Sequence, residues 1–498
     1  MGLQIIQIPT NASTTYTGTS IYDQMIPINW QPIAPVSVQL TDDISGFFKY
    51  KVILRVYKDS VSSSNLLATL KQRPNNASTT TNSVALFDIK GIVNTQLQST
   101  FFDANDTTES IHGLGINNNS KIFSKNYEQV QTIVIKATYE KATSSTTAPI
   151  EETTGYVQIS FETTRATFNL FNSFTNPLDN GFVINGLTSS LLTDNNTSFD
   201  ELRKLNKAIG GGSLLSGEIN YITKNNDNHT IAFINKNAYN SEGNYMCLKY
   251  YGSNGGQIGN TYTFENASTQ GGEPPASANS DDEYIIYAGC GSANLNGYGG
   301  ACFKNGVATA VFDGQPAQPI YTNYSYYTIY LSSDDAGATR KSKIYYFVRQ
   351  FDSIVNCKDI PIIRLAWTNS LGAWDYYNFN AGQTETIETE RMNYGQLLGT
   401  PSLDTGTKYA YYNWQGGTRT LYTKPKLKSR LQTQYILEEE SQFLESLFKS
   451  NNVIILTGQQ QSVVVTNKSF ERKTIEKDKL FIQYTFDIEY SNELNSNS

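Results

Sequence analysis

The chain has 498 residues, which is too many for one hydrophobic core, so we expect about three domains. Hydrophobic residues make up 39% of it and aromatic residues 12%, with 33 Tyr against 4 Trp, a balance that favours short strands over helical bundles. The formal net charge of -7 is spread along the chain without a basic arm, which argues against nucleic acid as a partner.

The same composition argues against a membrane segment and against a cofactor. No apolar run approaches the roughly 18 residues that span a bilayer, and residues 1–10 lack the charged start and apolar core of a signal peptide. We therefore expect no membrane insertion and a chain made and kept soluble in a cytoplasm. The four cysteines (Cys247, Cys290, Cys302 and Cys357) lack metal-site spacing, so we expect free, mostly buried thiols and no metal or organic cofactor.

The first region, residues 1–164, has the pattern of an antiparallel sandwich. Residues 50–57 alternate apolar and polar side chains, with Val52, Leu54 and Val56 on one face of a half-buried strand. Similar stretches recur roughly every 10 to 15 residues, with turn-forming residues between them. We predict an immunoglobulin-like (Ig-like) β-sandwich, in which the low-complexity residues 141–154 form a hairpin tip or loop.

The second region, residues 165–355, is also rich in predicted strands, and its connecting segments are rich in Gly, Asn and Ser. A short helix is predicted at residues 198–207, where Gly210 to Gly212 would end it. We predict a middle β-rich domain with long polar loops.

The third region, residues 356–498, holds three of the four tryptophans and the strongest helix signal. Residues 438–450 place four apolar side chains on one helical face: Phe443, Leu444, Leu447 and Phe448. Residues 480–490 alternate strictly between apolar and polar side chains, which predicts a closing strand. The predicted fold class is therefore all-β, with tandem antiparallel β-sandwich-like domains and one short C-terminal helix.

Candidate catalytic residues are few. The two histidines, His112 and His229, lie in Asn- and Gly-rich segments, and no G-x-S-x-G motif is present for a serine nucleophile. Residues 289–291 resemble the start of a dinucleotide-binding motif, but Asn294 stands where the third glycine belongs. We expect no enzymatic activity.

Two acidic stretches, residues 281–283 and 334–335, are candidates for the carboxylate pair of a glycosidase. Glycosidase carboxylates face each other across a cleft, about 5 to 10 Å apart, and adjacency in sequence gives no sign of that. The favoured interpretation is that these residues are solvated turn residues.

Two sets of residues are candidates for an interface with another subunit. The aromatic residues around a predicted hairpin at residues 363–379 form either a domain core, which we favour, or an anchor at a subunit interface. The basic residues of segment 424–430 share one face of a strand, which would meet an acidic partner or guard an edge against aggregation. The candidate interface residues are Trp367, Trp374, Tyr376, Tyr377, Phe379, Lys424, Lys426, Lys428 and Arg430.

Three stretches of the chain resemble one family. Arg364-Leu-Ala-Trp-Thr-Asn-Ser-Leu-Gly-Ala-Trp-Asp-Tyr-Tyr-Asn-Phe379 resembles the R-L-x-W-x-N-x-x-G-x-W/F-D-x-F-x-F segment of structural proteins in phages of Bacteroidetes, including crAss-like bacteriophages. Residues 437–448, 462–466 and 478–486 resemble the carboxy-terminal helix and strands of those proteins. Residues 48–50, 67–70 and 85–89 resemble their opening sandwich.

This resemblance implies a virion structural protein of the phage tail, made in the host cytoplasm, and carries over no catalytic residues. It favours a tail hub, ring or baseplate subunit that assembles with copies of itself and other phage tail proteins. The alternative is a receptor- or glycan-binding tail fibre or adaptor, whose partner is a host surface glycan or receptor. A tail depolymerase is a third, less favoured interpretation.

Overall fold

The computed structural model describes residues 2–9, 14–29, 31–41, 48–75, 83–97, 102–103, 106–115, 122–126, 129–164, 182–183, 190–191, 221–223, 226–234, 245–266, 285–296, 298, 300, 302–309, 312, 324–349, 362–369, 371–396, 400–401, 409–410, 417–433, 436, 438–458, 460–471 and 483–491. Of the described residues, 61% lie in strands and 7% in helices, which confirms the predicted all-β fold. The chain forms two compact units, Met1–Gln350 with Thr368–Asp375, and Phe351–Trp367 with Tyr376–Ser498.

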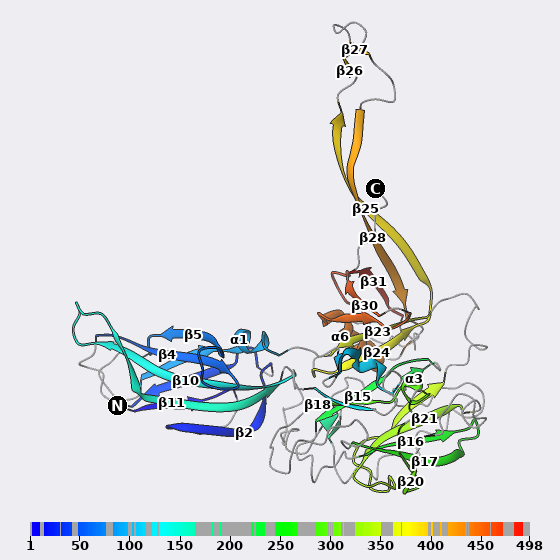
Figure 1. Ribbon diagram of the computed structural model, residues 1–498, viewed down its shortest axis with the longest axis horizontal. Helices are drawn as coiled ribbons and strands as arrows, with labels where there is room; N and C mark the ends of the chain where they lie inside the picture. The colour runs from blue at the N-terminus through cyan, green and yellow to red at the C-terminus, as the bar shows by residue number, and fades with distance from the viewer. Residues whose placement is uncertain are drawn as a thin grey trace. The chain divides into compact units, whose positions relative to one another are not determined.

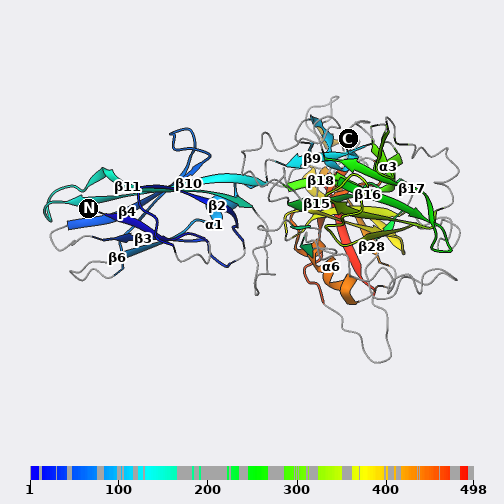
Figure 2. The same ribbon diagram turned by 90° about the horizontal axis from the view of Figure 1, so that it is seen from below.

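The first unit begins with a β-sandwich, whose two sheets are seen as separate layers in Figure 2. The three-stranded sheet runs in the order β1-β3-β6, and the five-stranded sheet in the order β2-β11-β10-β4-β5. Their strands are β1 (Leu3–Gln7), β2 (Thr19–Pro27), β3 (Pro35–Leu40), β4 (Phe48–Lys58), β5 (Leu66–Gln72), β6 (Ser83–Asp88), β10 (Val130–Ala142) and β11 (Ile150–Thr164), and helix α1 (Lys90–Asn94) follows β6. The β2–β11 pair is parallel and the other pairs in these two sheets are antiparallel.

The sandwich core confirms the faces predicted for its central strand. Val52, Leu54 and Val56 on β4 are fully buried in one cluster with side chains from both sheets. Burial of each such side chain contributes about 1.5 to 3 kcal/mol to folding. The hairpin tip is shorter than the predicted residues 141–154, because β10 continues to Ala142 and β11 begins at Ile150. An ion pair between Lys141 and Glu152, 3.6 Å apart, stabilises this end of the ladder.

A second hydrophobic core lies between two further sheets of the same unit, ordered β13-β12-β15-β18-β9 and β14-β22-β21-β16-β17-β19-β20. Alternate residues of the central strand β21, Tyr327, Ile329 and Leu331, point into this core. The elements of this part are β7 (Phe102–Asp103), β8 (Asp106–Ser110), η1 (Ile111–Gly113), β9 (Phe123–Asn126), β12 (Phe182–Val183), β13 (Ser190–Leu191), β14 (Tyr221–Thr223), β15 (Thr230–Ile234), β16 (Tyr245–Tyr251), β17 (Gln257–Glu265), β18 (Ile285–Gly289), α3 (Ser292–Asn296), β19 (Cys302–Lys304), β20 (Val307–Thr309), β21 (Tyr326–Ser332) and β22 (Tyr345–Arg349).

The strands around these two cores do not follow one another in sequence order. β9 precedes β10 of the sandwich, yet it pairs with β18, and Phe123 lies in the second core. The division into residues 1–164, 165–355 and 356–498 stays a prediction. The short helix predicted at residues 198–207 lies outside the described residues.

The second unit contains a seven-stranded sheet in the order β24-β23-β29-β30-β31-β28-β25 and helix α6. Helix α6 spans Glu438–Lys449, which confirms the helix predicted at 438–450. The closing strand β31 spans Thr485–Tyr490, and residues 480–482 of the predicted strand lie outside the described residues. The remaining strands are β23 (Ile363–Thr368), β24 (Trp374–Phe379), β25 (Gln383–Gln396), β26 (Thr400–Pro401), β27 (Tyr409–Ala410), β28 (Gly417–Gln432), β29 (Val453–Ile455) and β30 (Gln461–Val465).

Helix α6 packs through the aromatic face that its sequence predicts. The ring of Phe443 lies 5.1 Å from that of Trp367, and the ring of Phe448 lies 5.9 Å from that of Phe470. Phe470 in turn stacks on Tyr484, 4.8 Å between ring centroids. These contacts connect the helix to the residues preceding β31.

In the part of the chain that the structure describes, no helix is long and apolar enough to cross a membrane.

Candidate assembly surface

Residues 364–379, called the aromatic motif below, contain Asn369 and Gly372. The turn between β23 and β24 explains why these two residue types are needed there. The side-chain oxygen of Asn369 accepts hydrogen bonds from the backbone N–H groups of Leu371 and Ala373, at 2.9 and 3.0 Å. Its amide group donates to Asp375 at 2.9 Å. Gly372 adopts a φ of 92°, which a residue with a Cβ rarely does. The motif therefore encodes a side-chain-supported turn.

The large rings of the motif are buried within the chain. Trp367 is fully buried, and its indole N–H donates to Ser446 at 2.8 Å. Trp374 is also fully buried and meets His112 edge to face, with ring centroids 5.0 Å apart. Each indole thus fills a core position in its own unit.

The other aromatic candidates differ in exposure. Tyr376 and Phe379 are 2% and 3% exposed, whereas Tyr377 is half-buried. Burial of Trp367, Trp374, Tyr376 and Phe379 is what the core interpretation predicts, and it leaves little of their surface for a partner. The interface predicted for the aromatic set stays a prediction, and Tyr377 is the member that retains accessible surface.

The basic candidates lie on β28, where alternation places them on one face as predicted. Two of them bind carboxylates of the neighbouring strand β31. Lys426 lies 3.3 Å from Glu489, and the guanidinium of Arg430 lies 2.7 Å from Asp487. Some of the carboxylates that these basic side chains bind therefore lie on a strand of the same sheet.

Lys428 lies between two acidic strands. It forms an ion pair with Glu388 of β25 and lies 3.8 Å from Glu489 of β31. The hydrogen bond from Lys428 lowers the pKa of Glu388, and the same hydrogen bond raises the pKa of Lys428. Lys424 faces Glu390 across the ladder, and its ammonium lies 5.8 Å from the Tyr422 ring centroid. The basic face is thus one half of a charge-paired surface.

The strands β25 and β28 form a long hairpin, which extends beyond the rest of its sheet in Figure 1. They pair from Gln383↔Leu431 to Gln396↔Gly417, whereas β31 pairs with β28 only from Lys428 to Gln432. As far as the described strands show, most of the hairpin is therefore a two-stranded ribbon. From Thr384 to Gln396, every residue of β25 is exposed.

Large apolar side chains on this ribbon are exposed. Met392 and Tyr422 face each other across the ladder, and so do Ile387 and Leu427. The exposed fractions are 62% for Ile387, 52% for Met392, 43% for Tyr394, 61% for Leu421 and 41% for Tyr422. Exposed apolar groups clustered on one projecting element are typical of interaction sites. We take the β25–β28 hairpin as the candidate site.

Sequence reasoning found only the basic half of this hairpin. Strand β25 was missed because Thr, Glu and other polar residues occupy most positions on both of its faces, so that neither face has the apolar period that marks a strand. A usable signal was present in the complementary charges, since Glu388 and Glu390 have the same two-residue spacing as Lys424 and Lys426.

The two histidines are core residues. His112 packs against Trp374, and His229 meets Phe347 edge to face at 5.1 Å. The fully buried side chain of Asn294 connects their two segments. It donates to the carbonyls of His112 and Leu114 at 2.9 and 2.6 Å.

The same Asn294 side chain also accepts two backbone hydrogen bonds. Its oxygen accepts from the N–H groups of His229 and Gly291, at 2.8 and 3.1 Å. The asparagine that replaces the third glycine of the apparent nucleotide motif therefore has a structural task. It joins three segments that are distant in sequence.

Asp334 and three cysteines of the first unit also have structural roles. Asp334 accepts hydrogen bonds from the backbone N–H groups of Ala338 and Thr339, as a turn residue does. Residues 281–283 lie outside the described residues. Cys247, Cys290 and Cys302 are buried thiols, as predicted, and burial raises the pKa of Cys247 to about 12. Cys357 lies outside the described residues, among which no group of three or more His, Cys, Asp or Glu could hold a metal ion.

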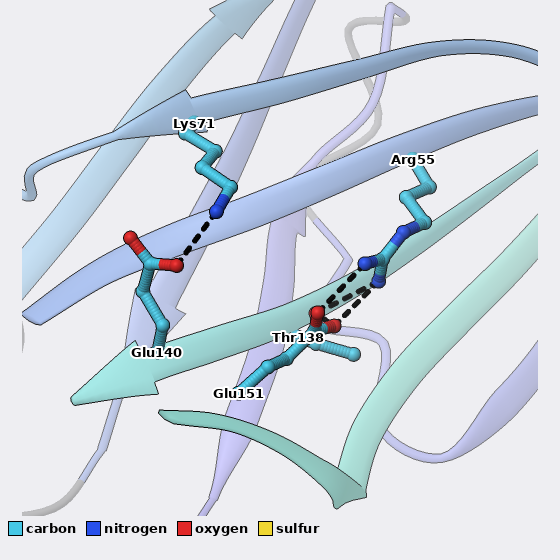
Figure 3. A network of polar contacts seen from close by, with 5 residues as sticks. All are labelled: Arg55, Lys71, Thr138, Glu140 and Glu151. Carbon is cyan, nitrogen blue, oxygen red and sulfur yellow. Dashed lines mark hydrogen bonds and ion pairs between the residues drawn. The ribbon is translucent and has the colours of Figure 1, made fainter. Parts of the chain in front are cut away.

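A polar network on the outer face of the five-stranded sheet was not predicted (Figure 3). Arg55 binds Glu151 with two hydrogen bonds of 2.5 and 2.7 Å, and Thr138 donates to the same carboxylate at 2.6 Å. The hydrogen bond from Arg55 is the main cause that lowers the pKa of Glu151 to about 2. Lys71 and Glu140 form a second pair at 2.7 Å. Each carboxylate has its own cation, so the network ties β10, β11, β4 and β5 together.

No protein-family model matches the chain, and no curated protein is significantly similar to it.

Proposed function

We propose that the chain is a non-enzymatic structural subunit of a phage tail, a hub, ring or baseplate component of the virion. In this proposal it assembles with copies of itself and with neighbouring tail proteins. The observation that carries the proposal is the β25–β28 hairpin, a ribbon whose residues are exposed over most of its length.

The physical argument is that such a ribbon is a poor final state for an isolated chain. A two-stranded hairpin without a packed layer is at best marginally stable in water, because it buries little apolar area. This hairpin nevertheless continues well past its last contact with β31 and carries exposed Met, Leu, Ile and Tyr side chains. Contact with another subunit would cover these groups and contribute to the stability of both partners.

The assignment to a phage tail draws support from the sequence resemblance. The motif that carries this resemblance, residues 364–379, builds a supported turn and buried rings, which is a structural and not a catalytic use. The histidines and Asp334 are likewise held in structural contacts. The proposal therefore assigns no reaction to the chain.

The glycan-binding alternative gains no specific support. It was motivated by the abundant tyrosines of the middle region, and many of these fill the second core. Tyr250, Tyr262, Tyr298, Tyr324 and Tyr327 all lie in that cluster. Rings buried in this way cannot stack on a sugar.

The experiment that tests the proposal is to locate the protein in purified virions. Quantitative mass spectrometry should find it in a fixed ratio to other particle proteins, and antibody-labelled particles in electron microscopy should carry the label on the tail. Absence of the protein from the purified particle would contradict the proposal.

A further inference from the structure

The β25–β28 hairpin has two open edges. Among the described strands, β25 is the terminal strand of its sheet, so no described strand pairs with the outer edge of its 14 residues. In the part of the chain that the structure describes, β28 pairs with β31 from Lys428 to Gln432, and no described strand pairs with that edge over residues 417–427. An open edge presents backbone donors and acceptors that can pair with another strand.

The two edges carry opposite charge. Three Glu and one Arg give β25 a net charge of -2. Over residues 417–427, one Arg and two Lys without any acidic residue give β28 a net charge of 3. A molecule whose two edges have net charges of opposite sign is complementary to a second copy of itself.

The ladder shows which residues would meet. Within the hairpin, Glu388 lies opposite Lys426, and Glu390 lies opposite Lys424. Neighbouring strands of a sheet place their side chains on shared faces. The open edge of β25 therefore offers the same two carboxylates to any β28 that lies beside it.

From these observations we infer that the partner of the hairpin is a second copy of this chain, with β25 of one copy beside β28 of the next. This inference rests on the proposed function as an assembling subunit. Hairpins that point the same way then alternate β25 and β28 in antiparallel order. Because the two edges are different, the contact is head-to-tail and repeats from copy to copy, and it forms a ring where the rotation between copies closes.

Like edges are disfavoured by the same charges. A β25 beside another β25 would bring Glu388 and Glu390 close to carboxylates, and a β28 beside another β28 would juxtapose lysines. Side-chain charge is then what selects the partner edge.

Apolar contacts would strengthen the correct pairing. Met392 lies opposite Tyr422, and Ile387 lies opposite Leu427, so each open edge carries part of an apolar pair. Side-by-side hairpins would cover these side chains between copies. Hydrophobic burial would supply affinity, while the charged pairs set the register.

Two variants of the full chain test the inference. In the first, Glu388→Lys and Glu390→Lys make both strands basic; in the second, Lys424→Glu and Lys426→Glu make β28 locally acidic. Neither variant alone should assemble, because like charges meet at each contact, and self-association should weaken about tenfold or more. An equimolar mixture should form oligomers in which the two variants alternate. Native mass spectrometry measures their composition.

A matched control exchanges one pair within a chain. Glu390→Lys combined with Lys424→Glu keeps opposite charges across the hairpin and between identical copies, so this variant should assemble with itself as the unchanged chain does. Near-UV circular dichroism of all variants checks that the buried tryptophans and tyrosines keep their packing. Charge-reversed variants that fold and assemble alone, or an unchanged chain that stays monomeric at its highest attainable concentration, overturn the inference.

The result is independent of the virion experiment. A chain that is present in the particle but does not self-associate through this hairpin contradicts the inference and leaves the proposed function standing. A chain that forms the predicted rings but is absent from virions contradicts the proposed function and leaves the self-pairing standing.

Discussion

Asn294 illustrates how much of this fold depends on single buried polar side chains. Its amide group forms four hydrogen bonds with backbone groups of three separate segments, and the side chain is fully buried. Buried polar groups are stabilising only when they are paired, because an unpaired group loses its hydration without compensation. The loop that resembles a nucleotide motif is therefore a packed junction.

Replacing this amide should destabilise the first unit strongly. The Asn294→Ala substitution removes all four of these hydrogen bonds from a fully buried junction, and we expect the free energy of unfolding to fall by about 3 to 5 kcal/mol. Urea denaturation followed by tyrosine fluorescence measures the loss. Asn254→Ala is the matched control, because Asn254 accepts a backbone hydrogen bond in an exposed loop, and its effect should be within about 1 kcal/mol. Equal effects for the two variants would contradict the assigned role.

Glu151 makes stability depend on acid pH. Its pKa is lowered in the folded chain to about 2 from an ordinary value of 4.5. A lowered carboxyl pKa means that the stabilisation is fully present above pH 4.5 and is lost as the pH falls toward 2. We expect Glu151→Gln to cost about 1 to 3 kcal/mol at neutral pH. The difference from the unchanged chain should shrink as unfolding is measured at successively lower pH.

The control for this titration is a second acidic residue of the same hairpin. Glu152 lies 3.6 Å from Lys141 and is more exposed, so Glu152→Gln should change stability by less than about 1 kcal/mol. A Glu151→Gln deficit that stays constant between pH 7 and pH 3 would argue against the Arg55 pair as its cause.

Among the elements, those with an apolar period were predictable from sequence and those without one were not. Helix α6 and the inward face of β4 follow from their apolar spacing, and the turn at Asn369 and Gly372 from its residue types. β25 has no apolar face, so no periodicity marks it as a strand. Its partner β28 was recognised only as a basic segment, since the paired carboxylates come from elsewhere in the chain.

The aromatic motif should behave as a core element. Trp374→Ala removes a fully buried indole and should lower the free energy of unfolding by about 3 to 5 kcal/mol. Tyr377→Ala, at a half-buried ring in the same strand, should cost less. Thermal unfolding of the two purified variants makes the comparison. A Trp374→Ala chain as stable as the original would show that the ring is not a core residue.

Hydrogen exchange should vary along the β25–β28 hairpin. In the monomer, amides of the outer pairs Asn393↔Thr420 and Tyr394↔Arg419 should exchange on the order of tenfold or more faster than those near Arg430, where β31 extends the sheet. The β10–β11 hairpin, which has neighbours on both sides, serves as a protected reference. Uniform protection along β25 in a confirmed monomer would mean that the ribbon needs no partner for stability.

For the whole molecule, composition predicted the fold class well because strand-rich chains are marked by local residue types. Contacts between residues that are far apart in the sequence could not be predicted from local residue types. β9 pairs with β18, far along the chain, and Thr368–Asp375 belong to the first unit although they lie among residues of the second. Only half of the candidate assembly surface could be predicted for the same reason, because its charge pairs join strands that are distant in sequence.

The central claim is that the β25–β28 hairpin joins subunits of a phage tail. A cryo-electron microscopy map of the intact particle tests it most directly. The account predicts tail density for several copies of the chain, with β25 of each copy beside β28 of the next and Met392 and Tyr422 covered at the contact. A particle without this chain, or one in which the hairpin is surrounded by solvent, would contradict it.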